Sequence, residues 1–225
     1  MEKSDRSEGA GGGLPWLRAS RAFTGDGTAF SDAVNNTGAA FACSFRTLND
    51  RFSRDFAAIN QAQWAEGKAC GRCINARCVD PMCKVRDEVV TVQVVDLCPE
   101  CAEGDVDFSF PAYESLTGLW PHRLQISWEW ASCAADIDGT ITYTPKDGIT
   151  PFWQAFYLAN LRFPLRSVSL NGRELQRSPY QFFIHPAQQP GPGAVLELVA
   201  DNGARISAVL DDVTKAQDLA VQFPL

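Results

Sequence analysis

One stretch decides the fold: VVDLCPEC at residues 94–101, which GDVDFS continues at residues 104–109. From residue 90 to residue 95, every second position is a valine, and this period of two predicts a half-buried β-strand that ends at Asp96. The turn after it is rich in carboxylates. The stretch therefore joins an apolar strand to an acidic turn at the rim of a sheet.

Asp107 is the candidate for chemistry in this stretch, because it lies between Val106 and Phe108. A carboxylate with apolar neighbours is a candidate for a raised pKa, and such a group can donate a proton to a sugar or ester oxygen. An aspartate that only caps a turn is the alternative. The stretch alone leaves both roles open.

Length and composition indicate a globular protein. The 225 residues are 45% apolar, 11% aromatic and 21% charged, which is typical of soluble proteins and enough for one large or two small domains. No apolar run approaches a bilayer span, so we expect no membrane association. The net charge of -7 argues against a nucleic acid partner, which needs a basic face. A neutral, hydroxyl-rich partner held by flat aromatic rings would suit this charge.

All eight cysteines lie between Cys43 and Cys133. An even number in a compact region predicts one domain with a disulfide framework, formed in an oxidising compartment. Met1 is followed by polar residues and a glycine run, so no secretion signal is recognisable. The glycosylation sequon that begins at Asn35 fits secretion.

The spacing of two CxxC pairs, Cys70–Cys73 and Cys98–Cys101, could bind zinc. Four further cysteines, and two histidines that are remote from the pairs in sequence, make zinc the weaker hypothesis. A redox pair at Cys98 and Cys101 is another alternative, although no βαβ pattern surrounds it. We expect neither a metal nor a cofactor.

Local patterns predict further elements in the first half of the chain. Apolar residues at helical spacing predict the one substantial helix at Phe56–Gln63. Residues 111–116 predict a single helical turn. The predicted strands and short elements are residues 28–30, 39–45, 88–95 and 125–130.

After residues 144–148 the cysteines disappear, and short strands alternate with turn signals, which is typical of a β-sandwich. Asn171-Gly172 and Asn202-Gly203 predict type I′ hairpins, whose two central residues both need a positive φ. The predicted strands are residues 152–158, 167–170, 180–184, 195–200, 205–210 and 219–223.

Two groups of side chains could carry function. Asp32, Asp96 and Asp107 could supply the two carboxylates that glycoside hydrolysis usually requires. Residues 152–153 (Phe-Trp) and Tyr180 place flat rings on predicted neighbouring strands. Such rings are either core residues or, on one exposed face, a platform for sugar rings.

Together these residues resemble the expansin family, from about Phe23 to Phe223. Residues 94–113 are similar to the family's strand, Asp-x-Cys-Pro turn and Asp-x-Ser signature. The resemblance implies a mainly β protein, with a six-stranded double-psi β-barrel followed by an immunoglobulin-like β-sandwich that serves as a carbohydrate-binding module. It divides the chain into a disordered tail (1–20), a barrel domain (21–144) and a sandwich domain (145–225).

The resemblance also implies roles for residues. Asp107 falls on the family's essential aspartate, and Asp96 on a second aspartate of the same groove. The other implied groove residues are Thr28, Phe30 and Glu100. The implied platform of the module is Phe152, Trp153 and Tyr180, with Lys146 beside it. The implied disulfides are Cys43–Cys70, Cys73–Cys133 and Cys78–Cys83, with Cys98–Cys101 as an extra local bridge.

The function implied by the resemblance is non-hydrolytic loosening of plant-type cell walls by a secreted, monomeric protein. Its expected partners are cellulose and a matrix glucan, xyloglucan or xylan. Asp32 lies four residues after Thr28, and it leaves an endo-β-1,4-glucanase open, with Asp107 as acid and Asp32 as base. A barwin-type binding or defence protein and a lytic transglycosylase that acts on peptidoglycan are further alternatives.

Overall fold

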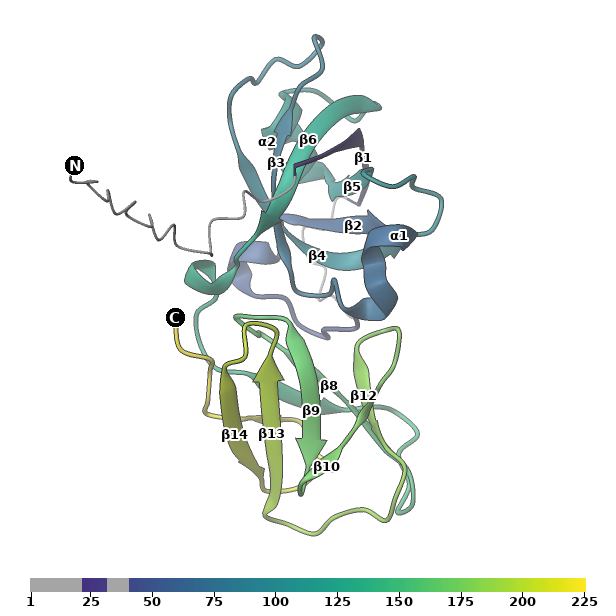
Figure 1. Ribbon diagram of the computed structural model, residues 1–225, viewed down its shortest axis with the longest axis vertical. Helices are drawn as coiled ribbons and strands as arrows, with labels where there is room; N and C mark the ends of the chain where they lie inside the picture. Colours follow the sequence, from purple (N-terminus) through teal and green to yellow (C-terminus); the bar gives the residue numbers. More distant parts are fainter. Residues whose placement is uncertain (1–21, 32–40) are drawn as a thin grey trace, which may run out of the picture.

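The computed structural model describes residues 22–31 and 41–225. The predicted N-terminal tail, Asp32 and the sequon at Asn35 lie outside these residues. The described chain is mainly β, as predicted, and it forms two parts that Figure 1 shows one above the other.

The first part is a closed six-stranded barrel with the strand order β1-β5-β2-β4-β3-β6. Its strands are β1 (Phe23–Ser31), β2 (Phe56–Asn60), β3 (Cys73–Cys78), β4 (Val90–Cys98), β5 (Val106–Ser109) and β6 (Leu124–Ala131). β1 pairs with β5, and β2 with β4, in parallel, whereas the other neighbours pair antiparallel. This interleaving of distant strands agrees with the predicted double-psi barrel.

The helix predicted at Phe56–Gln63 is wrong. Phe56–Asn60 is β2, and all five residues are buried. Only Gln61–Trp64 (α1) is helical, capped by the Asn60 side chain, which accepts a hydrogen bond from the Gln63 N–H (3.0 Å). A short strand buried on both faces has a continuous apolar run, and periodicity alone does not distinguish that run from a buried helix.

The longer described helix is α2 (Phe110–Thr117), for which a single turn was predicted. Ser109 caps its N-terminus by accepting a hydrogen bond from the Ala112 N–H, and Gly118 ends it in the left-handed conformation (φ 69°). The described 3-10 turns are η1 (Asp50–Phe52), η2 (Ala65–Gly67) and η3 (Ala134–Asp136).

β1 crosses the loop before β5 at a contact that requires glycine. A Cβ atom on Gly25 would lie 2.3 Å from the carbonyl carbon of Gly104. The indole N–H of Trp128 donates a hydrogen bond to the Gly104 carbonyl oxygen (2.8 Å). This crossing lets β5 lie directly beside β1, which brings Asp107 next to Thr28.

Four disulfides lie in the barrel part, and they pair the cysteines as the resemblance implied: Cys43–Cys70, Cys73–Cys133, Cys78–Cys83 and Cys98–Cys101. The zinc hypothesis for the CxxC pairs is therefore wrong, because zinc binds thiolates and these sulfurs are bonded to each other.

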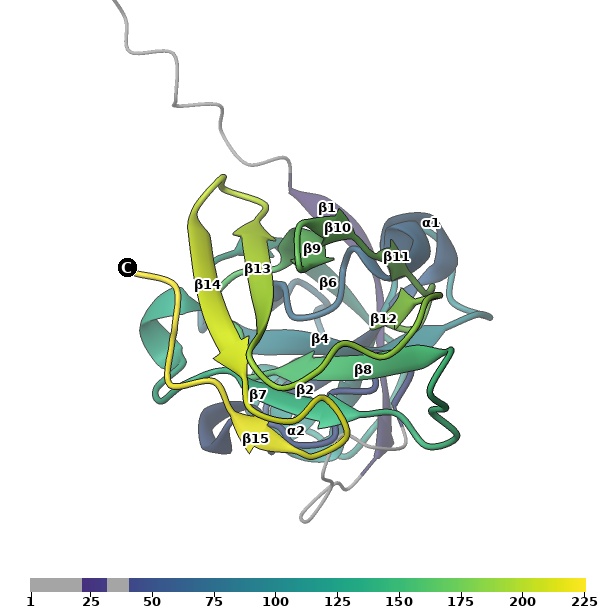
Figure 2. The ribbon, with the colours of Figure 1, turned by 90° about the horizontal axis from the view of Figure 1, so that it is seen from below.

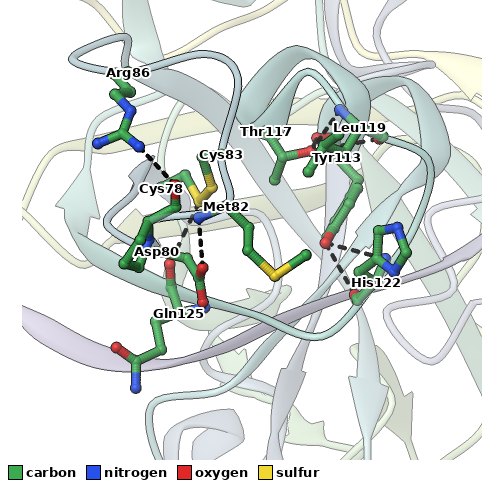
Figure 3. Close-up of a disulfide and its surroundings, with 11 residues drawn as sticks. Cys78, Asp80, Met82, Cys83, Arg86, Tyr113, Thr117, Leu119, His122 and Gln125 are labelled. Carbon is green, nitrogen blue, oxygen red and sulfur yellow. Dashed lines mark hydrogen bonds between the residues drawn. A yellow bond between two sulfur atoms is a disulfide. The ribbon is translucent and has the colours of Figure 1, made fainter.

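Figure 3 shows the Cys78–Cys83 disulfide, which closes the turn after β3. The Asp80 carboxylate in this turn accepts hydrogen bonds from the backbone N–H groups of Met82 (2.8 Å) and Gln125 (3.2 Å). In the same view, the Tyr113 hydroxyl donates to the carbonyl oxygen of His122 (2.9 Å). These contacts tie the turn to β6, and α2 to the segment that precedes β6.

The second part consists of two facing sheets, seen as two layers in Figure 2. Their strand orders are β10-β9-β13-β14 and β11-β12-β8-β7-β15. The strands are β7 (Thr142–Pro145), β8 (Gln154–Ala159), β9 (Leu165–Leu170), β10 (Arg173–Glu174), β11 (Gln176–Arg177), β12 (Phe182–His185), β13 (Ala194–Ala200), β14 (Arg205–Leu210) and β15 (Gln217–Asp218). Phe156 and Leu158 of one sheet share a buried core with Val168 and Leu196 of the other. This arrangement is the predicted sandwich.

Three local predictions fail. Residues 219–223 are not a strand, although Phe223 is fully buried in the core. The short element predicted at residues 39–45 is not regular where it is described, since residues 41–43 form a bend and a turn and residues 44–45 have no assigned structure, while residues 39–40 lie outside the described part. Asn171 and Gly172 both have positive φ (49° and 75°) as predicted, but in the second hairpin only Gly203 does (91°), so that turn is not type I′.

The barrel and the sandwich are in direct contact. Arg72 forms an ion pair with Asp201 (2.7 Å). The Asn49 side-chain amide donates a hydrogen bond to that of Asn160 (2.9 Å). Gly67 approaches the sandwich so closely that a Cβ atom there would lie 2.6 Å from the carbonyl oxygen of Pro179. These contacts hold the two parts together along several segments.

Candidate functional site

The barrel aligns two aspartates across neighbouring strands. Asp107 of β5 is paired with Thr28 of β1 on one side and with Ala58 of β2 on the other. Ala58 is in turn paired with Asp96 of β4. We call these four residues the carboxylate row. Two strand spacings separate the Cα atoms of the aspartates, which amounts to about 10 Å.

The Asp107 carboxylate is half-buried and hydrogen-bonded. The Thr28 hydroxyl donates to its Oδ1 (2.6 Å). Burial raises the pKa of Asp107 above its usual value; the hydrogen bond from Thr28 opposes this, and the negative charge of Glu100 adds to it. Asp107 therefore keeps its proton to a higher pH than an exposed aspartate does, and in that form it can donate as well as accept hydrogen bonds.

Asp96 lies within β4, not at its end as predicted, because the strand continues to Cys98. Its carboxylate accepts hydrogen bonds from the backbone N–H groups of Ala42 (2.8 Å) and Leu97 (2.9 Å). Burial raises the pKa of Asp96, and these two hydrogen bonds oppose the rise. Asp96 thus also ties the loop at residues 41–48 to the barrel.

The other predicted barrel residues lie in different surroundings. Glu100 is exposed in the turn that the Cys98–Cys101 disulfide closes. Phe30 is partly buried, and its ring packs edge-on against Phe41 and Phe56 (5.9 Å between centroids in each case). Asp32 lies outside the described residues.

The predicted aromatic residues of the sandwich lie outside its strands, because Phe152 and Tyr180 are in turns and Trp153 forms an isolated β-bridge with Thr150. Residues 152–153 precede β8, and Tyr180 precedes β12, the neighbour of β8. Phe152 is 75% exposed and Tyr180 53% exposed, while Trp153 is partly exposed. Because β8 and β12 are antiparallel, Trp153 and Tyr180 lie at opposite ends of this strand pair, roughly 15–20 Å apart. We call Phe152, Trp153 and Tyr180 the aromatic set.

Sequence reasoning missed two rings between these ends. Tyr157 of β8 is paired with Phe182 of β12, and their ring centroids are 5.9 Å apart. The neighbouring residues Phe156 and Phe183 point into the core, so Tyr157 and Phe182 are on the outer face of the sheet. Lys146 lies over the Phe182 ring, with Nζ 5.5 Å from the centroid. The alternation of β8 could have revealed Tyr157.

The described residues offer no alternative site for a metal. Residues 22–31 and 41–225 contain no group of three or more His, Cys, Asp or Glu side chains that could hold an ion. His122 is exposed. His185 is buried, and its Nδ1 has no hydrogen-bond partner among the described residues. Among the described helices, none is long and apolar enough to cross a membrane.

Comparisons with known sequences find a family model and several relatives that are similar to parts of this chain. A family model described as lytic transglycolase matches residues 56–119. Expansin-YoaJ of Bacillus subtilis is 29% identical over 98 residues, which cover 42% of this chain and 41% of that protein. Expansin-like protein 1 of Dictyostelium discoideum is 24% identical over 145 residues, which cover 60% of this chain and 49% of that protein. The chain thus spans less than half the length of these curated relatives.

Solved structures extend the likeness to both parts of the fold. The apo expansin of Clavibacter michiganensis has a TM-score of 0.73 and 23% identity, and the match covers 91% of this chain and all of that one. A mutant of the same expansin in complex with cellohexaose has a TM-score of 0.74 and 22% identity, with the same coverage. At this identity the likeness establishes the two-part fold.

Proposed function

We propose, from the premise that this chain is an expansin-family protein, that it binds cellulose and loosens plant-type cell-wall polysaccharides without cleaving them. The observation that carries the proposal is the presence of the carboxylate row and the exposed aromatic set on two packed parts of one chain. In this proposal, residues 21–144 form the barrel domain and residues 145–225 the carbohydrate-binding domain.

The barrel would bind one glucan chain through hydrogen bonds. The half-buried Asp107 carboxyl can accept a hydrogen bond from a sugar hydroxyl, or donate one at a pH low enough for it to hold its proton, while Thr28 keeps the carboxyl oriented. Asp96 and the exposed Glu100 would accept hydrogen bonds from other hydroxyls of the chain. Exchange of sugar–sugar for sugar–protein hydrogen bonds separates chains without breaking a covalent bond.

The sandwich would bind the cellulose surface through the aromatic set. Flat rings stack on the apolar faces of pyranose rings and need no charge, which suits a protein with a net charge of -7. Trp153 and Tyr180, at the two ends of the β8–β12 pair, would contact different sugars of the same chain. Lys146 would donate to hydroxyl groups between them.

Secretion to the cell wall, a monomeric state and a second partner among matrix glucans, xyloglucan or xylan, are further parts of the proposal. Secretion is supported by the four disulfides, which persist in oxidising compartments. The endoglucanase alternative requires Asp32 as the base that accepts a proton from water. Among the described carboxylates of the row, Asp96 accepts two backbone N–H groups at Oδ1, and in this proposal its other oxygen accepts from a sugar hydroxyl.

Co-sedimentation with cellulose, xylan and peptidoglycan tests the choice of polymer. We expect retention on cellulose, weaker retention on xylan and none on peptidoglycan. Retention on peptidoglycan alone would contradict the proposal and favour the lytic transglycosylase alternative. Failure to bind any of the three would favour a barwin-type protein with an inert barrel.

A further inference from the structure

The loop at residues 41–48 connects the carboxylate row to the outer face of the sandwich. At one end, the Ala42 N–H is bound to Asp96 of the row. The Cys43 N–H donates to the carbonyl oxygen of Val95 (3.0 Å), and Cys43 is bonded to Cys70. Further along, Ser44 and Arg46 both have positive φ (54° and 64°). Two non-glycine residues in this conformation cost energy, and such strain often accompanies function.

This loop places Arg46 on the sandwich. Its guanidinium lies 4.3 Å from the centroid of the Tyr157 ring, which contacts Phe182, and Lys146 lies over Phe182. We call Arg46, Tyr157, Phe182 and Lys146 the seam cluster. It lies between the two ends of the aromatic set, and it is tied through residues 42–46 to Asp96.

The hydrogen-bonding capacity of Arg46 is largely unused. A guanidinium has five N–H donors. Among the described residues, Nε has no partner, and the ion pair with Asp147 is long (3.9 Å) and involves a carboxylate that is 99% exposed. An exposed ion pair of this kind contributes little to stability. Nε is itself buried, so the exposed 31% of the side chain belongs to its other atoms, and the two terminal nitrogens are the donors that a ligand could use.

Arg72, the other arginine at the contact between the two parts, differs in this respect. It forms a 2.7 Å ion pair with Asp201, and its Nε donates to the carbonyl oxygen of Lys68 (3.3 Å). It also lies over an aromatic ring, that of Trp130. Both arginines therefore join the parts and lie on a ring, but among the described residues only Arg72 has close acceptors for its donors.

We propose that Arg46 is a sugar-binding residue, which donates hydrogen bonds to neighbouring hydroxyl groups of a neutral β-glucan that passes from the carboxylate row to the aromatic set. The planar fork of a guanidinium matches two adjacent oxygen acceptors, and its stacking on Tyr157 reduces the entropy lost on binding. A neutral chain fits better than an anionic one, because Asp147 and Asp96 lie near and the protein is acidic. This inference rests on the proposed function.

The test measures binding of cellohexaose and cellotriose by calorimetry for wild type, Arg46→Met and Arg46→Lys, with Arg72→Met as the matched control. A long chain can pass from the carboxylate row over the seam cluster to the aromatic set, whereas a short one can stack at one end of the aromatic set without reaching Arg46. We expect Arg46→Met to weaken cellohexaose binding about tenfold, with cellotriose unchanged. Arg46→Lys should weaken it too, because it lacks the fork. Arg72→Met should lower thermal stability but leave both affinities unchanged.

Equal cellohexaose binding by wild type and Arg46→Met would overturn this inference and leave the proposed function standing. An equal loss of affinity for both oligosaccharides in Arg46→Met and in Arg72→Met would also overturn it, because such a result indicates that Arg46 has a purely structural role. Tighter binding of oligogalacturonate than of cellohexaose by wild type would contradict the neutral ligand. Wild type that binds neither cello-oligosaccharide would overturn the proposed function, and this inference with it.

Discussion

The two candidate binding regions are built in opposite ways. The polar members of the carboxylate row are half-buried side chains at fixed strand positions, in a barrel part that contains all four disulfides. The aromatic set consists of exposed rings outside the strands, on a sandwich without a cysteine. Binding by the carboxylate row depends on the orientation of its side chains, and binding by the aromatic set depends on the exposed area of its rings. The two should therefore respond differently to reduction, mutation and pH.

The largest expected difference concerns the disulfides. Cys73–Cys133 closes a segment with a sequence separation of 60, and Cys78–Cys83 one of 5. From chain entropy, we expect that replacing Cys73 and Cys133 by alanines lowers the free energy of unfolding by about 4 kcal/mol. Replacing Cys78 and Cys83 by alanines should lower it by about 2 kcal/mol. Urea denaturation of the two double variants measures this.

The sandwich provides the control for the disulfide experiment. A reducing agent should lower the urea concentration at which the barrel unfolds. The near-ultraviolet signal of the sandwich should still be lost at the same urea concentration as before reduction. An equal shift of both parts on reduction would show that the barrel and the sandwich unfold as one unit, and the contrast between them would fail.

The next largest effect concerns the aromatic set. Trp153→Ala combined with Tyr180→Ala should weaken retention on cellulose about 100-fold, because two exposed rings lose their stacking on sugars. A depletion assay on microcrystalline cellulose measures it. Trp120→Ala is the matched control, since Trp120 is also an exposed indole (75%) but belongs to the barrel part. Undiminished binding by the double variant would show that the aromatic set does not bind cellulose.

The smallest effect concerns the pH dependence of stability at Asp107. Burial raises the pKa of this carboxyl in the folded state. The folded state then binds more protons than the unfolded one, so stability is full below the unfolded pKa of about 3.9 and falls as pH rises through the folded pKa. Asp107→Asn keeps an acceptor for Thr28 and removes the charge. It should raise the melting temperature by about 1–3 °C at pH 7.

At pH values below about 4, the gain from Asp107→Asn should vanish, because wild type is then protonated as well. Asp211→Asn, at an exposed position, should leave the melting temperature unchanged at both pH values. A gain that is as large in acid as at pH 7 would show that the charge of Asp107 is not its cause.

The difference between the regions also explains what sequence could predict. The strand that contains Val92 and Val94, and the sandwich strand at Arg205–Leu210, were predictable because their alternation is local. The carboxylate row was not predictable, because Ala58 lies between the two aspartates only through the pairing of β2 with β4 and with β5. No local pattern encodes such a pairing, and the same segment was predicted to be helical.

The proposed binding residues divide in the same way. Asp96 and Asp107 follow from their place in a signature, and Trp153 and Tyr180 from their residue type. Arg46 has neither signal, since it lies in an irregular loop and its importance comes from the Tyr157 ring of the other part. A residue whose role depends on contact between the two parts of the fold is visible only in the folded chain.

In the proposed function, the carboxylate row loosens polysaccharide without cleaving it. The most direct test measures the extension of heat-inactivated plant walls, beside the release of reducing sugar from amorphous cellulose, for wild type and Asp107→Asn. We expect wild type to extend the walls without release of sugar. We expect Asp107→Asn to cause no extension but still to be retained on cellulose. Release of soluble reducing sugar by wild type, lost in Asp32→Asn, would contradict the account and establish hydrolysis.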